Sequence, residues 1–345
     1  MLVFAVRRLL IAVLTIVIVT ALIFSIVNGN KIALRAIAVA ELGGMTPIDQ
    51  QDSWVEKNIL TDPMPVRYIN WLTGFVVGDW GYSNVFRQHI IGFDEQEGWG
   101  VINTRLAATG MLAFWVFITM IPLALIVGVA AGVREGSLRD RTLSVLSIVT
   151  TATPEYVSGV IFAVILASRN YHITQYIPDI PQSIAQGQLL FFDKPVFKAV
   201  ANLDRGWDFH DFFLPALTMM LYGFGYIARM TRASMTEVMA SQYIRTAILK
   251  GLPRHRVIFT HALRNALVAP FTVIMLQFPW LLTGVVVVEV MFSFKGFGWT
   301  LNEAAKNMDY HLIMACSVIS IVVVLATQLI SDIGYILLNP RLRFR

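Results

Sequence analysis

The chain has 345 residues, of which 56% are hydrophobic and only 14% are charged, and its mean hydropathy is +0.65. Soluble domains carry roughly 25% charged residues, so this composition excludes an ordinary soluble domain and indicates a polytopic membrane protein. The formal net charge of +5 does not indicate a nucleic-acid-binding protein, because the positive charges gather in short segments beside apolar runs. The single cysteine, Cys316, excludes an internal disulfide framework.

Six apolar runs divide the chain, and we interpret them as transmembrane helices. The first, from Leu9 to Val27, follows Arg7 and Arg8 and is about long enough to cross a bilayer. A signal peptide is the alternative, but the Ala38-Val39-Ala40 tripeptide that resembles a cleavage site lies too far beyond the run. We therefore predict an uncleaved first span. The other five runs extend over approximately 107–133, 142–167, 213–227, 266–290 and 313–338.

The distribution of basic residues predicts which loops face the cytoplasm. Arginine and lysine gather before the first run, in two short loops and in the C-terminal tail. Short basic loops stay inside, so we predict that both termini are cytoplasmic. The predicted organisation is a first transmembrane helix over 1–28, an external segment over 29–105 and a five-helix core over 106–345, which contains an external insertion over 168–212 and a cytoplasmic loop over 229–264.

The cytoplasmic loop 229–264 carries seven lysines and arginines against one acid, Glu237. Its apolar residues recur at helical spacing, which predicts a helix with one apolar face. Gly251 is placed to end that helix, Pro253 blocks its continuation, and a second helical run follows from Arg254. We interpret the loop as a docking surface; a basic loop that only fixes topology is the alternative. The residues of the apolar face are Met235, Val238, Met239, Tyr243, Ile244, Ala247 and Ile248.

The same loop resembles the cytoplasmic EAA loop of the inner-membrane permease subunits of ABC importers. The alanine–x–x–x–glycine core is present as Ala247 to Gly251, with Arg245-Thr246-Ala247 in place of the literal EAA. The segment 261–267, HALRNAL, resembles the dipeptide/oligopeptide permease B-type branch, although Arg264 stands where that family has proline. The resemblance covers nearly the whole chain and extends to the external Gly-Asp turn at Gly78, Asp79, Gly81 and Ser83.

This resemblance implies an all-α fold with the six transmembrane helices of a type I importer permease in a bacterial inner membrane. The implied partners are a second permease subunit, two cytoplasmic ATP-binding subunits and an external substrate-binding protein. No GxxxxGK[ST] motif is present, so ATP must be hydrolysed by another polypeptide, and we expect no catalytic residue, cofactor or metal in this chain. The residues implied to couple the permease to the ATPase are Tyr243, Arg245, Thr246, Ala247, Lys250, Gly251 and Leu252.

Glu155 follows Pro154 near the middle of the third run. A rise of about 1.5 Å per residue from Thr142 places its carboxylate roughly at the midplane of the bilayer, with Tyr156 at the same depth. A charge there is costly and usually faces a cavity or a partner. We interpret Glu155 and Tyr156 as residues of the translocation path. A structural hydrogen bond between spans is the alternative that the sequence leaves open.

Two other classes of function are weighed against the importer permease. An intramembrane enzyme or an assembly subunit would need reactive groups at one depth, and Glu155 is the only candidate. An autonomous secondary transporter would need inverted repeats with broken helices, and the sequence gives no sign of them. Co-purification with an ATPase separates the first class from the others. The substrate stays open among di- or oligopeptides, nickel, glutathione, opines and oligosaccharides.

Overall fold

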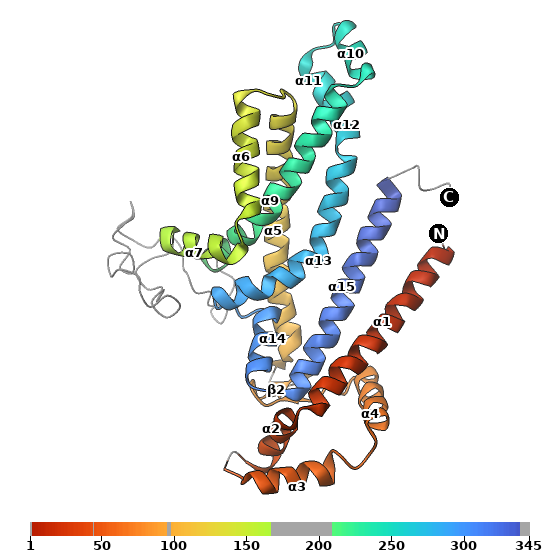
Figure 1. Cartoon of the computed structure of the whole chain (residues 1–345), viewed down its shortest axis with the longest axis vertical. Helices are drawn as coiled ribbons and strands as arrows, with labels where there is room; N and C mark the ends of the chain where they lie inside the picture. The colour runs from red at the N-terminus through yellow and green to blue at the C-terminus, as the bar shows by residue number, and fades with distance from the viewer. Residues whose placement is uncertain (1, 44, 95–97, 167–208, 339–345) are drawn as a thin grey trace. The chain divides into compact units, whose positions relative to one another are not determined.

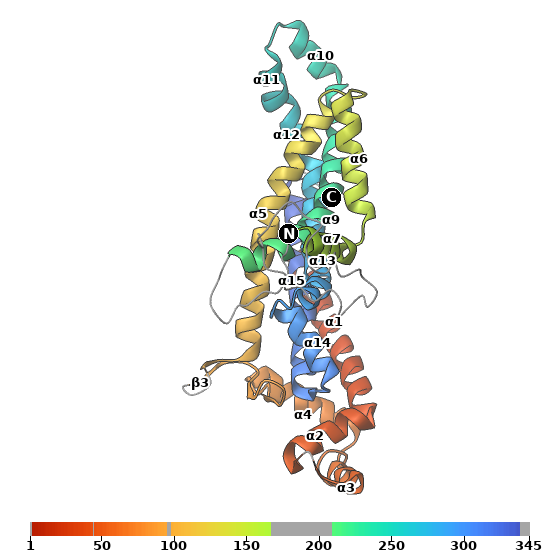
Figure 2. The same ribbon diagram turned by 90° about the vertical axis from the view of Figure 1, so that its left-hand side faces the viewer.

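The computed structural model describes residues 2–43, 45–94, 98–166 and 209–338. The chain divides into two compact units, which are drawn together in Figures 1 and 2 and are described separately here. The first unit contains residues 1–109 and 296–326, and the second contains 110–295 and 327–345. The external insertion predicted over 168–212 lies outside the described residues, apart from its last four, which begin a helix.

Within the described part of the chain, four helices are long and apolar enough to cross a membrane. They are found within 7–29, 101–132, 211–239 and 310–334. Two further pairs of helices pass the same test together but are bent, by 105° between 152 and 155 and by 50° between 266 and 268. The total reaches the predicted six spans if each bent pair is counted as one span.

The first unit is a helical assembly with two small hairpins that the sequence did not predict. The hairpins are antiparallel, with Tyr82 opposite His89 in one and Phe93 opposite Trp99 in the other. Its elements are α1 (Leu2–Gly29), α2 (Lys31–Leu42), α3 (Ile48–Asn58), α4 (Met64–Val77), β1 (Tyr82–Ser83), β2 (Gln88–His89), β3 (Phe93–Asp94), β4 (Gly98–Trp99), the start of α5 (Val101–Gly132), α14 (Phe297–Lys306) and most of α15 (Tyr310–Leu338).

Asp309 fixes the Gly-Asp turn segment to the start of α15. Its carboxylate accepts hydrogen bonds from the Ser83 hydroxyl at 2.7 Å and from the Val85 amide at 3.2 Å. The same side chain caps the helix by accepting from the Leu312 amide at 3.2 Å. Gly81 has φ +81°, and a Cβ there would lie 2.9 Å from the His311 ring. The turn predicted from the Gly78-Asp79 pair is present, because Gly78 has a left-handed backbone with φ +104° after the end of α4.

Polar contacts also fix α1, α2 and α3 in the first unit. The Asn28 side chain donates to the Tyr310 hydroxyl at 2.9 Å and accepts from Arg67 at 2.5 Å. The Arg35 guanidinium on α2 donates two hydrogen bonds, of 2.6 and 2.7 Å, to the Asp52 carboxylate on α3. These hydrogen bonds hold the pKa of the Asp52 carboxyl below its ordinary value.

The second unit is built around α9 (Phe209–Met239), against which α6, α7 and α13 pack. Beyond the end of α9, the chain makes a short helical excursion through α10 and α11 before it returns (Figures 1 and 2). The remaining elements are α6 (Leu138–Ala152), α7 (Glu155–Leu166), α10 (Gln242–Leu249), α11 (Arg254–Arg256), the π-helix η3 (Val257–Ala262), α12 (Leu263–Ala266) and α13 (Val268–Met291).

Glycines let the helices of the second unit approach closely. A Cβ on Gly128 of α5 would lie 2.4 Å from Cβ of Thr231 and 2.6 Å from the Ala228 carbonyl oxygen on α9. A Cβ on Gly225 of α9 would lie 2.3 Å from the Thr150 hydroxyl on α6. Small residues at helix crossings are a general means of packing helices in membranes, because backbones can then touch. Two neighbouring helices are thereby held tightly on α9.

The third predicted span is not one continuous helix, which corrects the single helix expected over 142–167. α6 ends at Ala152, and α7 leaves it at 105°. Thr153 is extended, with φ −84° and ψ 119°, because the ring of a following proline disfavours helical geometry in the preceding residue. Pro154 has no amide to donate, so the helical hydrogen bonding restarts from its carbonyl, which accepts from the Val157 amide.

We predict that Gly128→Val will lower the thermal stability of the purified protein, because the new side chain would force α5 away from α9. Overpacking of this kind costs about 1–3 kcal/mol. The matched control is Gly110→Val in the same helix, where an added Cβ meets nothing within 4 Å. The midpoint of thermal unfolding in detergent should fall for Gly128→Val and change little for Gly110→Val. Equal midpoints for the two variants would contradict this packing.

Candidate functional site

The loop that follows α9 is held together by a small buried core, which we call the Met235 cluster. It joins the end of α9, the inner face of α10 and the returning chain through η3 and α12. Val238, Met239, Leu252 and Leu263 pack around it with part of their surface exposed. The loop is therefore a packed structure of its own. The buried members of the Met235 cluster are Met235, Ile244, Ala247, Val257, Ala262 and Ala266.

The predicted apolar helix is divided in two, which corrects the expectation of one continuous helix. α9 ends at Met239, and α10 begins at Gln242 after the extended residue Ser241. Part of the predicted apolar face is buried, because Met235 on one helix and Ile244 on the other turn inward to the same cluster. Tyr243 and Ile248, which were predicted on that face, are exposed instead. The break folds α10 back so that both apolar faces serve one core.

Gly251 ends α10, and this part of the prediction is confirmed. It has a left-handed backbone with φ +77°. Its amide donates to the Ile248 carbonyl at 2.9 Å, and the Leu252 amide donates to the Ala247 carbonyl at 3.4 Å. This pair of bonds forms a Schellman motif, in which glycine avoids the strain of a Cβ in left-handed geometry. Pro253 then precedes α11, as a residue unable to continue the helix.

The outer face of α10 exposes large apolar side chains. Leu249 is 80% exposed, Ile248 55% and Tyr243 44%. Arg245, Thr246, Lys250 and Gly251 are exposed as well. This face therefore combines apolar side chains with positive charge. Exposed apolar residues that are grouped in this way indicate a surface for another molecule.

The coupling residues predicted from the sequence thus fall into two groups. Tyr243, Arg245, Thr246, Lys250 and Gly251 lie on the exposed side, whereas Ala247 is buried in the Met235 cluster and Leu252 packs against it. The prediction missed Leu249, the most exposed apolar side chain of α10. The sequence could have predicted the exposure of Leu249, because a residue five positions after the inward-facing Ile244 points to the other side of a helix.

Hydrogen bonds to the returning chain fix α10 and the end of α9. The Tyr243 hydroxyl on α10 accepts from the Asn265 side chain on α12 at 2.9 Å. The Ser234 hydroxyl on α9 donates to the Ala266 carbonyl at 2.7 Å. Exposed Arg254, Arg256 and Arg264 add positive charge around this face. Arg264, which replaces the family's proline, continues a short helix here.

Glu155 and Tyr156 lie at the beginning of α7, immediately after the bend. Glu155 is half-buried, and Tyr156 is 56% exposed. Asp or Glu in the first turn of a helix is favourable, since unpaired amides and the helix dipole attract negative charge there. The two residues are far along the chain from α10 and belong to a separate candidate site.

Comparison with known proteins identifies the chain's relatives. Residues 120–344 match the family described as "Binding-protein-dependent transport system inner membrane component". The chain is 31% identical to the dipeptide transport system permease protein DppB of Escherichia coli (strain K12), with all of both chains covered. It is 31% identical to the oligopeptide transport system permease protein AppB of Bacillus subtilis (strain 168) over 85% of each chain. A probable peptide ABC transporter permease of Sinorhizobium fredii is 28% identical over 88% of this chain and 89% of its own.

The family match covers well over half of the chain, and two relatives exceed 30% identity over most of its length. Members of this family are transport subunits, so the intramembrane enzyme and the assembly subunit receive no support. ATP is hydrolysed by a separate subunit of the transporter. The apolar helices agree with a multi-pass membrane protein of this kind. The chain belongs to the family of binding-protein-dependent transport system inner membrane components.

Proposed function

We propose that this permease forms half of the translocation path of an importer for dipeptides or oligopeptides. The observation that carries the proposal is 31% identity over its whole length to a dipeptide permease, together with a similar match to an oligopeptide permease. Uptake of labelled dipeptide by cells that express the complete transporter tests it. Uptake that unlabelled di- and tripeptides with ordinary α-peptide bonds suppress is expected, whereas suppression only by nickel, the γ-linked glutathione, opines or oligosaccharides would contradict it.

The complete transporter contains this chain, a second permease of the same fold, two ATP-binding subunits and an external substrate-binding protein. The positive charges of the loops support an arrangement in which α10 and both termini are cytoplasmic, and the segment 29–105 is external. In this arrangement the docking face of α10 meets the ATP-binding subunits in the cytoplasm. The external segment 29–105 is on the side from which the substrate-binding protein approaches.

α10 docks in a groove of an ATP-binding subunit through Leu249, Ile248 and Tyr243, with Arg245 and Lys250 at the rim. Burying a leucine side chain contributes about 1.5–3 kcal/mol, so Leu249 should be an anchor of this interface. The Met235 cluster supports the proposal, because it holds α10 on α9 and lets the outer face act as a rigid surface. Ala247 and Leu252 do not contact the ATP-binding subunit themselves; they position α10 through their packing in the Met235 cluster.

We predict that Leu249→Asp will weaken association with the ATP-binding subunits about tenfold or more, because it places a charge in an apolar contact. The yield of ATP-binding subunit that co-purifies with the tagged permease measures the effect. Leu138→Asp is the matched control, since Leu138 is also 80% exposed but lies outside α10. Retention of the ATP-binding subunits by Leu249→Asp, or their equal loss from both variants, would contradict docking through α10.

We predict that Gly251→Val will impair transport while leaving the permease folded. An added Cβ meets nothing within 4 Å, so its effect comes from the φ of +77° and not from a clash. A non-glycine residue in this conformation costs about 1 kcal/mol or more, which should loosen the end of α10. Substrate-stimulated ATP hydrolysis and uptake should both fall. Gly251→Asn is the control and should retain more of both, because asparagine tolerates left-handed geometry; full activity in Gly251→Val would contradict this role.

Glu155 and Tyr156 line the translocation path in this proposal. The bend at residues 153–154 supports it, because broken helices in membranes are tolerated where they line a cavity or are buried in protein. The half-buried Glu155 carboxylate would then face a cationic group of the substrate or an arginine of the second permease. The exposed Tyr156 ring offers an apolar face with a polar end to the same path.

We predict that Glu155→Gln will reduce uptake of cationic peptides roughly fivefold more than uptake of neutral peptides, a difference of about 1 kcal/mol in recognition. The substitution keeps the shape of the side chain and removes its charge. Glu237→Gln, which removes an exposed charge at the end of α9, is the control and should leave the ratio unchanged. The ratio of the two uptake rates is the measurement. An unchanged ratio in an assembled Glu155→Gln transporter would favour the structural hydrogen bond instead.

A further inference from the structure

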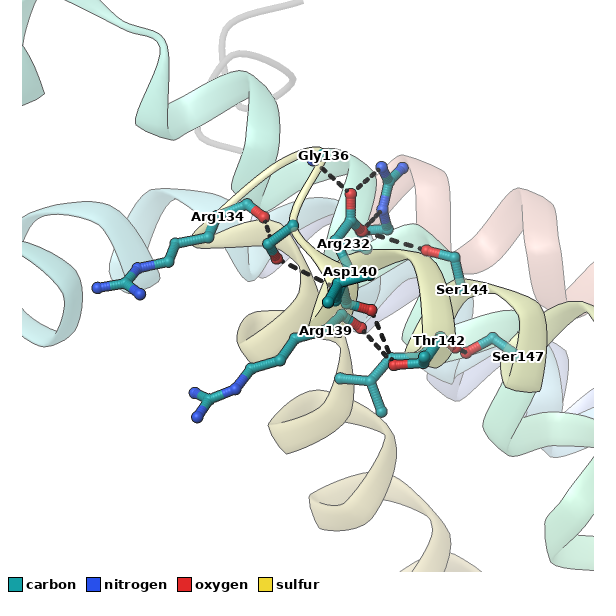
Figure 3. A network of polar contacts seen from close by, with 11 residues as sticks. Arg134, Gly136, Arg139, Asp140, Thr142, Ser144, Ser147 and Arg232 are labelled. Atoms are coloured by element: carbon teal, nitrogen blue, oxygen red, sulfur yellow. Dashed lines mark hydrogen bonds and ion pairs between the residues drawn. The ribbon is translucent and has the colours of Figure 1, made fainter.

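A polar joint links the first turn of α6 to α9 (Figure 3). The Asp140 carboxylate forms an ion pair with Arg232, whose Nη2 donates to Oδ2 at 2.8 Å and whose Nε donates to Oδ1. Asp140 also accepts from the Gly136 amide at 2.9 Å and from the Ser144 hydroxyl at 3.2 Å. The two helices therefore meet through a two-pronged contact whose acceptor is fully occupied.

The joint is sheltered from solvent on its acidic side. The Asp140 side chain is 3% exposed, and that of Arg232 is 31% exposed. A buried ion pair is weak evidence for a gain in fold stability, because replacing it by well-packed apolar residues of similar size often leaves the stability equal or higher. What the two-pronged geometry supplies is a fixed orientation of one group against the other. The pair thus suits a position in which the placement of α6 against α9 matters.

The joint lies on a continuous route from α10 to the bend. Arg232 is one turn before Met235, which anchors the cluster that holds α10. Asp140 is in the first turn of α6, and the far end of α6 leads into the bend before Glu155. Near that far end, Gly225 of α9 lies against Thr150 and Thr151. α6 is therefore attached to α9 at both of its ends.

We propose that the Asp140–Arg232 pair is the positioning joint through which a displacement of α10 reaches α6 and the bend at residues 153–154. Without the pair, α9 could move with α10 while the first turn of α6 stayed behind. With it, α6 moves with α9 as one body, and the start of α7 is carried along. This inference rests on the proposed docking of α10 to the ATP-binding subunits.

The test uses the complete transporter in liposomes, with uptake and ATP hydrolysis measured in the same sample. Asp140→Asn removes the charge but keeps the size of the side chain. We expect the ATP hydrolysed per substrate molecule transported to rise about tenfold, which is within the range of coupling factors between distant sites. Co-purified ATP-binding subunit should stay at the level of the unmodified complex, because the docking face of α10 is untouched.

Arg139→Gln is the matched control, because Arg139 is exposed in the same turn and points away from the joint (Figure 3). It should leave the ATP-to-substrate ratio unchanged. A double-mutant cycle with Arg232→Gln adds a test of the pair itself. If the two residues act as one joint, the double variant should be no worse than the more affected single variant.

The outcomes separate the joint from the docking proposal. An unchanged ATP-to-substrate ratio in Asp140→Asn with ATP-binding subunits bound would overturn the joint and leave docking intact. Additive losses in the double-mutant cycle would also overturn it. Arg232→Lys, which retains the charge and loses the two-pronged contact, replaces Asp140→Asn if that variant does not assemble. A proportional fall of uptake and ATP hydrolysis in Arg232→Lys would show a structural role only and contradict the inference.

Discussion

The structure of the second unit depends on the burial of Ile244 and Ala247 against Met235. α10 is too short to be stable alone in water, because helices of fewer than about 12 residues are marginal without packing. Its inner face supplies that packing by contacting the end of α9 and the returning chain. Only when this face is buried does the opposite face, with Leu249 outermost, become a defined surface. The proposed docking function is thus a consequence of the same amphipathic pattern that folds the loop.

The rest of the second unit extends this constraint along α9. Gly128 lets α5 lie against the backbone of α9, and Gly225 lets α6 do the same. The helices are therefore in direct contact and are not separated by long, flexible side chains. Interiors packed in this way transmit displacement, because they cannot be compressed to absorb it. In the proposed function, a rigid α9 with α10 at one end would let a transport subunit without an ATP site respond to an ATPase. The bend before Glu155 marks where α6, which is held against α9, is followed by the differently oriented α7.

The sequence predicted the features that arise from local patterning. Apolar runs located the long helices, but α9 ends at Met239, twelve residues beyond the predicted end at 227, and α1 begins seven residues before the predicted start at Leu9. Gly251 was correctly predicted to end α10, and its backbone is left-handed. The pattern did not predict the break between Met239 and Gln242, because residues on both helices face one core and so preserve a single apparent period. The family motif did not predict the exposure of Leu249, because it specifies only the alanine and the glycine on either side, and its alanine, Ala247, is buried whereas Leu249 is exposed.

The hairpins β1–β2 and β3–β4 could not be predicted, because strands of two residues carry no period and depend on tertiary contacts such as the one between Ser83 and Asp309. The sequence also could not predict how sharply the chain bends at Pro154. A proline predicts a disturbance in a helix, but the packing of α6 and α7 on α9 determines whether the chain kinks slightly or turns by 105°. The joint between Asp140 and Arg232, separated by 92 positions, likewise exists only in the folded chain.

The most direct test of the central claim is cysteine cross-linking of α10 to the ATP-binding subunit in the intact transporter. The single native cysteine, Cys316, is buried and can be replaced by alanine to give a background without thiols. A cysteine at position 249 should cross-link to the ATP-binding subunit, whereas one at position 244, which faces the Met235 cluster, should not. Cross-linking from position 244 but not from 249, or from neither in an active complex, would contradict the account.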